Sequence, residues 1–388
     1  MTYSIQTLNN ISDKGLSLLP ASKYVVANEA VNPDAILLRS FKMHDMQIPA
    51  SLKAVGRAGA GVNNIPLDKM SDAGVVVFNA PGANSNAVKE LVIAGMLMAC
   101  RNLVLARDFA INLEGTDDEI GKQVEAGKKT FAGFELPNRT LGVVGLGAIG
   151  VLVANAAIAL GMRVIGYDPL ISIDKAWELD SHVEKARDIE QLLKESDFIT
   201  FHVPLVDATK DLINADSIKI MKDNAIVLNF ARNGIVNDEA ICAALDSGKL
   251  YSYVCDFPSN LLNNHNRVIA LPHLGASTAE AEENCAIMVA DEVRNYLESG
   301  TIKNSVNMPA IELPRAGESR LAMIHKNIPN MVGQLTQILG EAGANIIHMV
   351  NASRDEVAVT LMDLEVAVSE ATAKELSNIE GMLKLRIL

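Results

Sequence analysis

Residues 140–168 read TLGVVGLGAIGVLVANAAIALGMRVIGYD, and this stretch decides the fold of the chain. The apolar run Leu141–Val144 is typical of a buried parallel strand, and the glycine-rich turn after it leads into an alanine-rich helix that ends near Gly161. A second apolar run, Met162–Tyr167, predicts the next strand, which Asp168 ends. Strand, turn, helix and strand in this order predict one βαβ unit of a parallel sheet.

The glycine-rich turn GLGAIG fits a loop that binds phosphates. Gly145 is expected to make the tight turn, Gly147 to let backbone N–H groups approach a pyrophosphate, and Gly150 to let the helix pack close to the strand. The N–H groups of Ala148 and Ile149 fall in the first helical turn, where the positive end of the helix favours phosphates. We predict a dinucleotide-binding loop; a turn that only joins packed elements is the alternative.

Asp168 sets the expected cofactor. It follows Gly150 by 18 residues, about the spacing of the acid that bonds the adenosine ribose in such units. A carboxylate at this position repels a 2′-phosphate, so NAD is favoured over NADP.

Composition narrows the class of protein. A chain of 388 residues predicts two or three domains. With 34 basic and 47 acidic residues the net charge is −13, which argues against nucleic acid or an anionic membrane as a partner. An anionic small molecule needs only a local basic pocket.

The sequence shows neither a cysteine motif for metal binding nor a targeting segment. The four cysteines are scattered without CxxC spacing, so neither a disulfide framework nor a metal site is expected, and a reducing compartment fits. The first ten residues show no signal peptide. The longest fully apolar run, Leu91–Cys100, is shorter than the roughly 18 residues of a membrane span. A cytoplasmic location is expected.

Strand and helix patterns alternate on both sides of the central unit. A long apolar helix, Ser85–Ile111, is expected to be buried between domains or subunits. The other predicted strands before residue 300 are Tyr24–Ala27, Ala35–Leu38, Leu52–Val55, Val75–Asn79, Phe198–Val203, Ala225–Phe230, Tyr251–Cys255 and Val268–Leu271. Helices are predicted at Ile189–Glu195, Asp238–Asp246 and Ser277–Glu298. This is a doubly wound α/β sheet with helices on both faces.

The C-terminal part has a different order. Residues 300–320 contain two prolines and little periodicity, which predicts a linker. After it come a strand at Arg320–His325, a helix at Met331–Glu341, strands at Asn345–Asn351 and Glu356–Leu364, a helix at Ser369–Ile379 and a strand at Leu383–Leu388. This βαββαβ order predicts a ferredoxin-like unit, which carries no acid–base constellation and is therefore expected to be regulatory or oligomeric.

Two arginines of the first domain are candidate ligand-binding groups. Arg39 follows a predicted strand, and Arg57 follows another within a glycine-rich loop. Ligands of open α/β sheets bind at the carboxyl ends of strands. The N–H groups near Gly59, Ala60 and Gly61 suit a carboxylate, and the guanidinium groups suit a phosphate. Solvated arginines beside a plain turn are the alternative.

Hydride transfer between NAD and an alcohol needs an acid–base group and a cation that holds the substrate. Histidine suits the first role because its ordinary pKa, about 6.5, lies near neutral pH. His273 lies between a predicted strand and the long helix 277–298, and Arg232 follows the predicted strand 225–230. Both are expected at the carboxyl ends of strands, facing the cofactor, although a lone histidine is more often structural.

Four motifs together resemble the D-isomer-specific 2-hydroxyacid dehydrogenases. They are GLGAIG at 145–150, HVPL at 202–205, NFARNGIVNDEA at 229–240 and PHLGAST at 272–278. In addition, LAMIHKNIPNMVGQLTQIL at 321–339 resembles an ACT domain. The resemblance covers nearly the whole chain, and it is closest to the short members of the family that carry an ACT unit.

This resemblance implies a Rossmann-type NAD-binding domain, a flavodoxin-like substrate domain split in sequence, and a ferredoxin-like ACT domain. The implied boundaries are 1–92 and 285–308 for the substrate domain, 93–284 for the NAD domain, 309–319 for a linker and 320–388 for the ACT domain.

The resemblance also implies roles for single residues. Arg232 would hold the substrate carboxylate and carbonyl oxygen, and His273 would be the acid–base group. Arg57, Arg39 and Lys128 would form the phosphate site. Family positions that line the cofactor match Pro204, Thr209, Ala231, Asp256 and Gly275. In the ACT unit His325, Asn327 and Asn345 match positions that hold the inhibitor L-serine in some relatives.

One segment departs from the family pattern. The family places a glutamate, which pairs with the histidine, a few residues after the strand-end aspartate; here the segment is shortened and Asn260 falls at about that place. An amide orients an imidazole but does not stabilise imidazolium as a carboxylate does. Either Glu282 or Glu283 takes over from the next helix, or His273 works without an acid.

The implied function is NAD-dependent oxidation of 3-phospho-D-glycerate to 3-phosphohydroxypyruvate, the first step of L-serine biosynthesis, in a homodimer or homotetramer that L-serine inhibits. The alternatives are a hydroxypyruvate or glyoxylate reductase on the same scaffold, and a non-catalytic NAD-sensing binding module.

Overall fold

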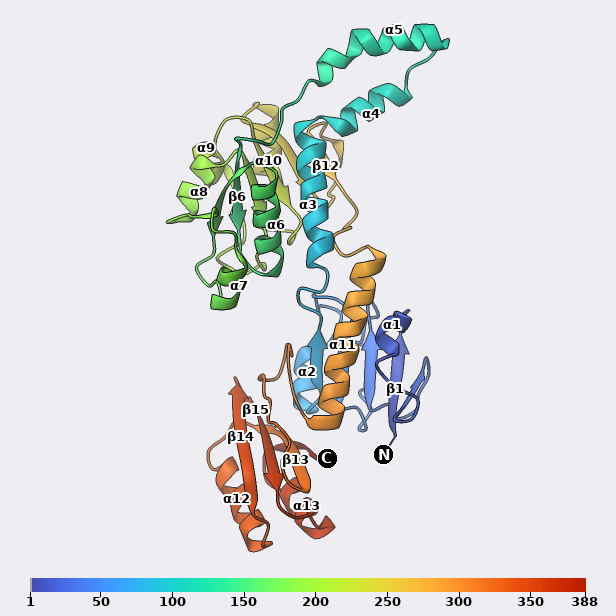
Figure 1. Ribbon diagram of the computed structural model, residues 1–388, viewed down its shortest axis with the longest axis vertical. Coiled ribbons are helices and arrows are strands. Elements are labelled where there is room, and N and C mark those ends of the chain that lie inside the picture. Colours follow the sequence, from blue (N-terminus) through green and yellow to red (C-terminus); the bar gives the residue numbers. More distant parts are fainter. Residues whose placement is uncertain (1) are drawn as a thin grey trace. The chain divides into compact units, whose positions relative to one another are not determined.

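The computed structural model describes residues 2–388, the side chain at position 264 excepted (Figure 1). The chain forms two compact units. One, the split unit, contains residues 1–84 and 279–388, and the other, the central unit, contains residues 85–278.

The central unit is built on a seven-stranded parallel sheet in the order β12-β11-β10-β9-β6-β7-β8. The predicted βαβ unit is confirmed as β6 (Thr140–Val144), α6 (Ala148–Ala159) and β7 (Arg163–Tyr167). The remaining strands are β8 (Glu184–Lys185), β9 (Phe198–Phe201), β10 (Ala225–Asn229), β11 (Leu250–Cys255) and β12 (Val268–Ala270). The strand order reverses between β6 and β9, which is where ligands bind in sheets of this type.

Helices flank this sheet. Those at Ile189–Glu195 and Asp238–Asp246 match the prediction residue for residue. Besides α6, the helices of the unit are α3 (Ser85–Cys100), α4 (Leu103–Ile111), α5 (Asp117–Gly127), α7 (Ile173–Glu178), α8 (Ile189–Glu195), α9 (Ala215–Ile220) and α10 (Asp238–Asp246), with short 3₁₀ turns η1 (Lys128–Phe131) and η2 (Leu262–Asn264).

The prediction of one long buried helix at 85–111 is wrong. The helix breaks after Cys100, because Asn102 adopts a left-handed conformation with φ of 51°, which asparagine tolerates better than most residues. Residues of α3 pack in the core of the unit, whereas none of the residues of α4 is buried.

The first part of the split unit has a five-stranded sheet in the order β2-β1-β3-β4-β5, and its pairs are parallel. The strands are β1 (Tyr3–Leu8), β2 (Tyr24–Ala27), β3 (Ala35–Leu38), β4 (Ala54–Arg57) and β5 (Val76–Asn79). The helices are α1 (Asp13–Leu16), α2 (Leu67–Asp72) and the long α11 (Ala279–Ser299).

Two features of this sheet were not predicted. β1 lies inside the sheet although its sequence, YSIQTL, is half polar; only Ile5 and Thr7 are buried, so the apolar signal was weak. β4 begins at Ala54, two residues later than predicted, so Arg57 is the last residue of the strand and not part of the loop.

The C-terminal part has the predicted βαββαβ order. Its four strands form an antiparallel sheet in the order β14-β15-β13-β16. The elements are β13 (Ser319–Lys326), α12 (Met331–Glu341), β14 (Ile346–Arg354), β15 (Val357–Leu364), α13 (Glu370–Ser377) and β16 (Met382–Ile387).

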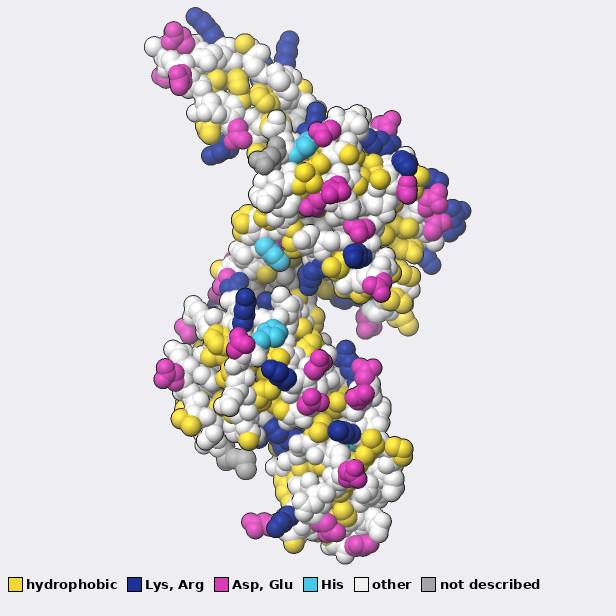
Figure 2. Space-filling view, turned by 180° about the vertical axis from the view of Figure 1, so that it is seen from behind, with side chains coloured by type: hydrophobic (Ala, Val, Ile, Leu, Met, Phe, Trp, Pro, Cys, Tyr) yellow, Lys and Arg dark blue, Asp and Glu magenta, His cyan; other side chains and the backbone are white. Residues whose placement is uncertain are grey.

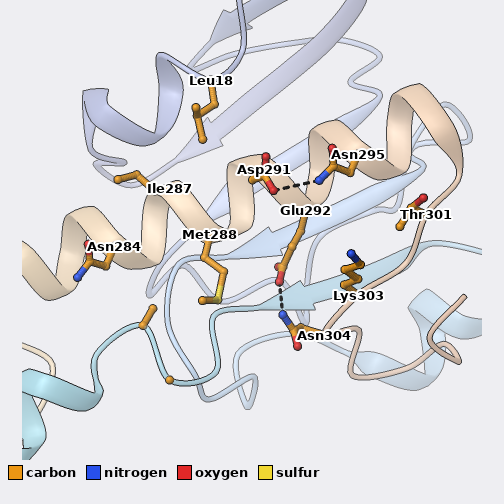
Figure 3. A pocket seen from close by; sticks show the side chains of 12 residues that line it. Leu18, Asn284, Ile287, Met288, Asp291, Glu292, Asn295, Thr301, Lys303 and Asn304 are labelled. Carbon is orange, nitrogen blue, oxygen red and sulfur yellow. Dashed lines mark hydrogen bonds between the residues drawn. The ribbon is translucent and has the colours of Figure 1, made fainter. Parts of the chain in front are cut away.

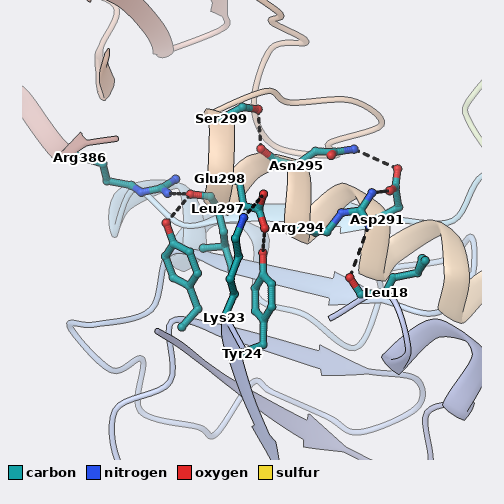
Figure 4. A network of polar contacts seen from close by, with 11 residues as sticks. Leu18, Lys23, Tyr24, Asp291, Arg294, Asn295, Leu297, Glu298, Ser299 and Arg386 are labelled. Carbon is teal, nitrogen blue, oxygen red and sulfur yellow. Dashed lines mark hydrogen bonds and ion pairs between the residues drawn. The ribbon is translucent and has the colours of Figure 1, made fainter. Parts of the chain in front are cut away.

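This C-terminal sheet shares a hydrophobic core with the end of α11. Ala322 and Leu361 of the sheet belong to the same buried cluster as Tyr296 and Leu297. The Arg386 guanidinium donates to the carbonyl oxygen of Leu297 (Figure 4). It also donates to the carbonyl oxygen of Tyr296 at 3.0 Å, and its carbon lies 4.7 Å from the centre of the Tyr296 ring. A cation at a helix C-terminus adds donors to the last carbonyls and interacts favourably with the helix dipole.

Acidic and basic side chains are interspersed over the face of the molecule seen in Figure 2. Within residues 2–388 no helix is long and apolar enough to cross a membrane. The same residues contain no group of three or more His, Cys, Asp or Glu side chains placed to hold a metal ion.

Candidate active site

The glycine loop between β6 and α6 has the geometry that a dinucleotide needs. Gly145 has φ of 89°, and a Cβ atom there would lie 2.5 Å from the carbonyl oxygen of His202. A Cβ atom on Gly150 would lie 1.9 Å from the carbonyl oxygen of Gly145, so this glycine permits the close approach of helix and turn. A Cβ atom on Gly147 would meet nothing within 4 Å, which leaves room for a phosphate beside the backbone.

The N-terminus of α6 also fits a phosphate. Gly147 is its N-cap residue, and no side chain caps the helix. The first-turn N–H groups, which include those of Ala148 and Ile149, therefore have no capping side chain, and the dipole of the helix favours an anion there. The residues present fit the pyrophosphate of NAD.

Asp168 lies at the end of β7 and is held by the loop that it faces. Its two carboxylate oxygens accept hydrogen bonds from the N–H groups of Leu146, at 2.8 Å, and Leu170, at 2.9 Å. These bonds fix a negative charge next to the glycine turn, as the expected role toward the ribose requires.

The loop after β10 places Arg232. Asn229, the last residue of β10, is 1% exposed. Its side chain accepts from the Ala231 N–H at 3.2 Å and donates to the Arg232 carbonyl at 2.9 Å. The Arg232 side chain is exposed, and its guanidinium donates to the Ala231 carbonyl at 2.7 Å. The sequence motif contained Asn229, but its positioning role was missed, because nothing in a linear pattern shows which way a buried amide points.

His273 lies in the loop after β12 with an exposed side chain and a positive φ of 50°. Its ring packs edge-on against Phe257, with centroids 5.2 Å apart and planes at 77°. The aromatic contact fixes one side of the imidazole. Phe257 was not singled out from the sequence.

Asp256, at the end of β11, is the buried acid of this region. It is 2% exposed, and burial raises the pKa of its carboxyl, while the charge of His273, the backbone N–H of Gly275 and the charge of Arg232 lower it. Its Oδ1 atom has no hydrogen-bond partner within residues 2–388. The side chains of Arg232 and His273 thus act electrostatically on one buried carboxylate, although they come from different loops.

The shortened segment after Asp256 is anchored to another element. Ser259 donates to the carboxylate of Asp238 at 2.8 Å and accepts from the Leu262 N–H at 3.3 Å. Asn260 lies beside this anchor in the sequence. Glu282 and Glu283, one of which was a candidate to replace the family acid, form ion pairs within the split unit, Glu282 with Arg39 and Glu283 with Lys14.

Two further predicted cofactor residues, Pro204 and Thr209, belong to the loop after β9. The Thr209 hydroxyl donates to the Pro204 carbonyl at 2.6 Å and accepts from the Val206 N–H at 2.9 Å, which closes the loop after β9. His202 precedes this loop; burial lowers its pKa to about 3, so its ring is neutral at physiological pH.

In the split unit, Arg57 and Arg39 lie at the ends of neighbouring strands. The Arg57 Nε donates to the Arg39 carbonyl at 3.1 Å. A Cβ atom on Gly59 would lie 1.9 Å from the Arg57 guanidinium, so this glycine is required for the arginine's position. The Gly59 backbone also has φ of 149°, a conformation that glycine adopts more readily than other residues.

Two asparagines that the sequence did not reveal hold the Arg39 loop. The Asn9 Oδ1 accepts from the N–H groups of Arg39, Ser40 and Phe41, and the Asn64 Nδ2 donates to the carbonyls of Arg39 and Phe41. Their signal was weak, because both occur in polar segments without a motif.

A cavity of about 470 Å³ adjoins Arg39 in the split unit. Its wall includes Arg39, Lys14, Ala58 and the two glutamates at the start of α11, Glu282 and Glu283. The Arg39 guanidinium lies 2.5 Å from Glu282, and the Lys14 ammonium lies 2.6 Å from Glu283. Both cations thus have carboxylate partners in this structure.

Four further predicted residues lie outside these regions, and His325 is the buried one among them. Lys128 lies at the start of η1 and forms an ion pair with Glu125. His325 of β13 is 2% exposed, and its ring nitrogens face the Lys326 carbonyl at 2.9 Å and the Thr360 hydroxyl at 2.8 Å. Asn327 donates to the Asp355 carbonyl at 3.1 Å, and the Asn345 carbonyl accepts from the Glu365 N–H.

A family model and similar proteins of known sequence point to the same enzyme family. Residues 93–275 match the D-isomer specific 2-hydroxyacid dehydrogenase, NAD binding domain. The chain is 37% identical to a D-3-phosphoglycerate dehydrogenase of Methanocaldococcus jannaschii over 305 aligned residues. The aligned region covers 77% of this chain and 55% of the relative. It is 35% identical to a hydroxypyruvate reductase of Thermotoga maritima over 290 aligned residues. This aligned region covers 72% of this chain and 87% of the relative.

A solved structure agrees with these matches. The NAD⁺-bound 3-phosphoglycerate dehydrogenase of Entamoeba histolytica superimposes with a TM-score of 0.62 at 26% identity, over 79% of this chain and 99% of that one. The chain spans about half the length of the first curated relatives it matches, at 55%, 54% and 49%. The glycine loop, the strand-end acid and these likenesses show that the chain belongs to the D-isomer-specific 2-hydroxyacid dehydrogenase family and carries its NAD-binding domain.

Proposed function

We propose that this protein oxidises 3-phospho-D-glycerate to 3-phosphohydroxypyruvate with NAD, the first step of L-serine biosynthesis. The observation that carries the proposal is the arrangement around Asp256, where Arg232 and His273 both act on one buried carboxylate at the carboxyl ends of strands in the NAD-binding unit. A cation for a carboxylate and an imidazole for a hydroxyl proton are the two groups that this oxidation needs.

Each residue has a definite part in the reaction. Bound NAD supplies the hydride acceptor. Arg232 holds the substrate carboxylate bidentately and polarises the oxygen at C2. His273 takes the proton from the C2 hydroxyl, and the negative charge of Asp256 stabilises the imidazolium that results. Asn229 holds the backbone of Arg232, and Phe257 packs against the ring of His273.

Arg57, Arg39 and Lys128 are the proposed phosphate contacts. Arg57 is supported by its fixed position over Gly59 at the end of β4. Arg39 has Glu282 as a partner, so a substrate phosphate would replace that carboxylate. The relative of M. jannaschii, named for phosphoglycerate, supports the phosphorylated substrate.

The second candidate is a hydroxypyruvate or glyoxylate reductase. The similarity to the T. maritima hydroxypyruvate reductase and the carboxylate partners of Arg39 and Lys14 favour it, because a site with neutralised cations suits an acid without a phosphate.

For the C-terminal βαββαβ sheet we propose an ACT domain in a homodimer or homotetramer. Its element order supports this assignment. L-Serine at Asn327 and Asn345 would then inhibit turnover. His325 is more suited to supporting the sheet from within, since both of its ring nitrogens are occupied.

The test is NADH oxidation with 3-phosphohydroxypyruvate, hydroxypyruvate and glyoxylate, each with and without L-serine. The proposal expects a kcat/KM at least ten-fold higher for the phosphorylated acid. Arg57→Ala should raise KM for the phosphorylated acid far more than KM for the other two acids. The control is Arg107→Ala, at an exposed position of α4, which should leave KM for all three acids unchanged. Equal use of the three acids would favour the reductase, and a serine-insensitive rate would remove the regulatory role.

A further inference from the structure

A second cavity of the split unit, of about 710 Å³, has no part in the proposed reaction (Figure 3). One wall is a face of α11, and the others come from the chain just after α1, the connection after β5 and the chain that follows α11. It shares none of its lining residues with the cavity beside Arg39. Its volume lies within the usual range of small-molecule sites, roughly 300–1,000 Å³.

Glu292 is the unusual group in the wall of this cavity. It extends from α11 toward Asn304, whose amide donates to Oε1 at 2.6 Å (Figure 3). The residue is 7% exposed, and its other oxygen, Oε2, has no hydrogen-bond partner within residues 2–388. A buried carboxylate with unused acceptor capacity is costly. Burial accordingly raises the pKa of Glu292 to about 7.

The Oε2 atom is itself buried, so a ligand in the cavity reaches it only after the carboxyl group turns. The terminal torsion of glutamate is broad, which permits this turn. No change of the helix is needed.

The other charged groups of the wall are already engaged. Asp291 pairs with Arg294 and accepts from the Asn295 amide at 3.0 Å. Lys303 lies 3.1 Å from the carboxylate of Glu312. Glu292 is therefore the charged lining residue whose bonding capacity is least used.

The rest of the cavity wall is partly apolar. Leu18, Ile287 and Met288 give the cavity apolar lining. Ile287 and Met288 lie on α11 with Glu292, and Leu18 comes from the chain after α1 (Figure 3). Apolar walls with few polar anchors suit a ligand with a short hydrocarbon body.

We propose that this cavity binds a small molecule that carries a primary ammonium group on a short aliphatic body, with the Glu292 carboxylate as the anchor. The ammonium supplies the donors that Glu292 lacks and forms a charge-assisted hydrogen bond with it. The hydrocarbon body covers the apolar wall. A carboxylate or phosphate ligand is disfavoured, because it would face both Asp291 and Glu292.

The test is isothermal titration of the full chain at pH 8 with n-butylammonium chloride, and with sodium butyrate as the probe of opposite charge. Saturable binding of n-butylammonium and none of butyrate is expected. Glu292→Gln should weaken the binding at least ten-fold. Glu280→Gln, which removes a carboxylate from the first turn of the same helix but outside the cavity, should leave it unchanged.

Ile287→Trp provides a second test that leaves the carboxyl group in place. It fills the apolar side of the cavity and should also weaken binding at least ten-fold; it decides the matter if Glu292→Gln does not fold. Absence of saturable binding by the wild type, or unchanged affinity in the folded variants, would overturn the proposal.

Discussion

The carboxylate of Glu282 lies 2.5 Å from the guanidinium of Arg39 at the edge of a cavity. A phosphate that binds Arg39 must displace this carboxylate. Glu282→Gln should therefore lower KM for 3-phosphohydroxypyruvate by about two- to five-fold, since partly exposed ion pairs contribute up to about 1 kcal/mol. KM for glyoxylate should not change.

Glu283→Gln is the matched control for this experiment. It frees Lys14 and leaves Arg39 paired. An equal effect of the two variants on KM would show that general charge, and not the Arg39 pair, governs affinity.

Asp256 is expected to set the pH dependence of the reaction. Removing its charge in Asp256→Asn makes imidazolium less stable at His273, because an opposite charge favours the protonated ring. The acidic limb of the kcat/KM profile for oxidation should move to lower pH, and kcat should fall by about 10- to 100-fold. The measurement is initial rate of NADH formation between pH 5 and 9.

Asp238→Asn serves as the control for that profile, because it removes a carboxylate that holds Ser259 in the neighbouring segment. A profile that is the same in Asp256→Asn and the wild type would exclude Asp256 as the acid that supports His273.

Asp168 should decide between the two nicotinamide cofactors. Asp168→Ser removes the charge that repels a 2′-phosphate while keeping a hydroxyl for the ribose. The ratio of kcat/KM for NADH over NADPH should fall at least ten-fold, as measured with one oxo acid at fixed concentration. An unchanged ratio would mean that other residues discriminate between NADH and NADPH. The control is Asp174→Ser in α7, which removes one negative charge at another position.

Glu292 should make the fold less stable as pH rises. Its folded pKa of about 7 lies above the ordinary value of 4.5, so the native state binds the proton more tightly than the unfolded state. The stabilisation is complete below about pH 4.5 and is lost as pH rises to about 7, by about 3 kcal/mol in total. Asp291 on the same helix adds to this effect, and the Asn304 amide opposes it.

The measurement is urea unfolding of the wild type and Glu292→Gln at pH 5 and 7.5. The difference in unfolding free energy between the two proteins should change with pH in favour of the variant at pH 7.5. A difference independent of pH would contradict the buried titration.

Arg386 should bind the C-terminal sheet to α11. Arg386→Met keeps the apolar stem but removes the donors to the carbonyls of Tyr296 and Leu297 and the contact with the Tyr296 ring. A loss of about 2–4 kcal/mol in unfolding free energy is expected, because two hydrogen bonds from a buried charged group and the ring contact are lost. The Tyr296 carbonyl keeps the N–H of Gly300 and the Leu297 carbonyl keeps the hydroxyl of Tyr3. Arg315→Met, which removes an exposed bond to the Leu388 carbonyl, should cost about 1 kcal/mol or less.

The sequence by itself determined the elements that depend on local pattern. The glycine loop, β6, α6, β7 and the strand-end Asp168 lie where the spacing predicted, because strand and helix periods and glycine geometry act over a few residues. The same holds for α8, α10 and α12. The βαββαβ order of the C-terminal part was readable for the same reason.

Tertiary structure alone decided what depends on contacts between distant segments. β1 became an internal strand although its sequence is half polar, because neighbours on both sides complete its hydrogen bonds. Asn9 and Asn64 hold the Arg39 loop from 30 and 25 residues away. The partners of Glu282 and the unused oxygen of Glu292 likewise follow from burial and packing. Charge partners and desolvation are properties of the folded surroundings, and no local pattern of residues encodes them.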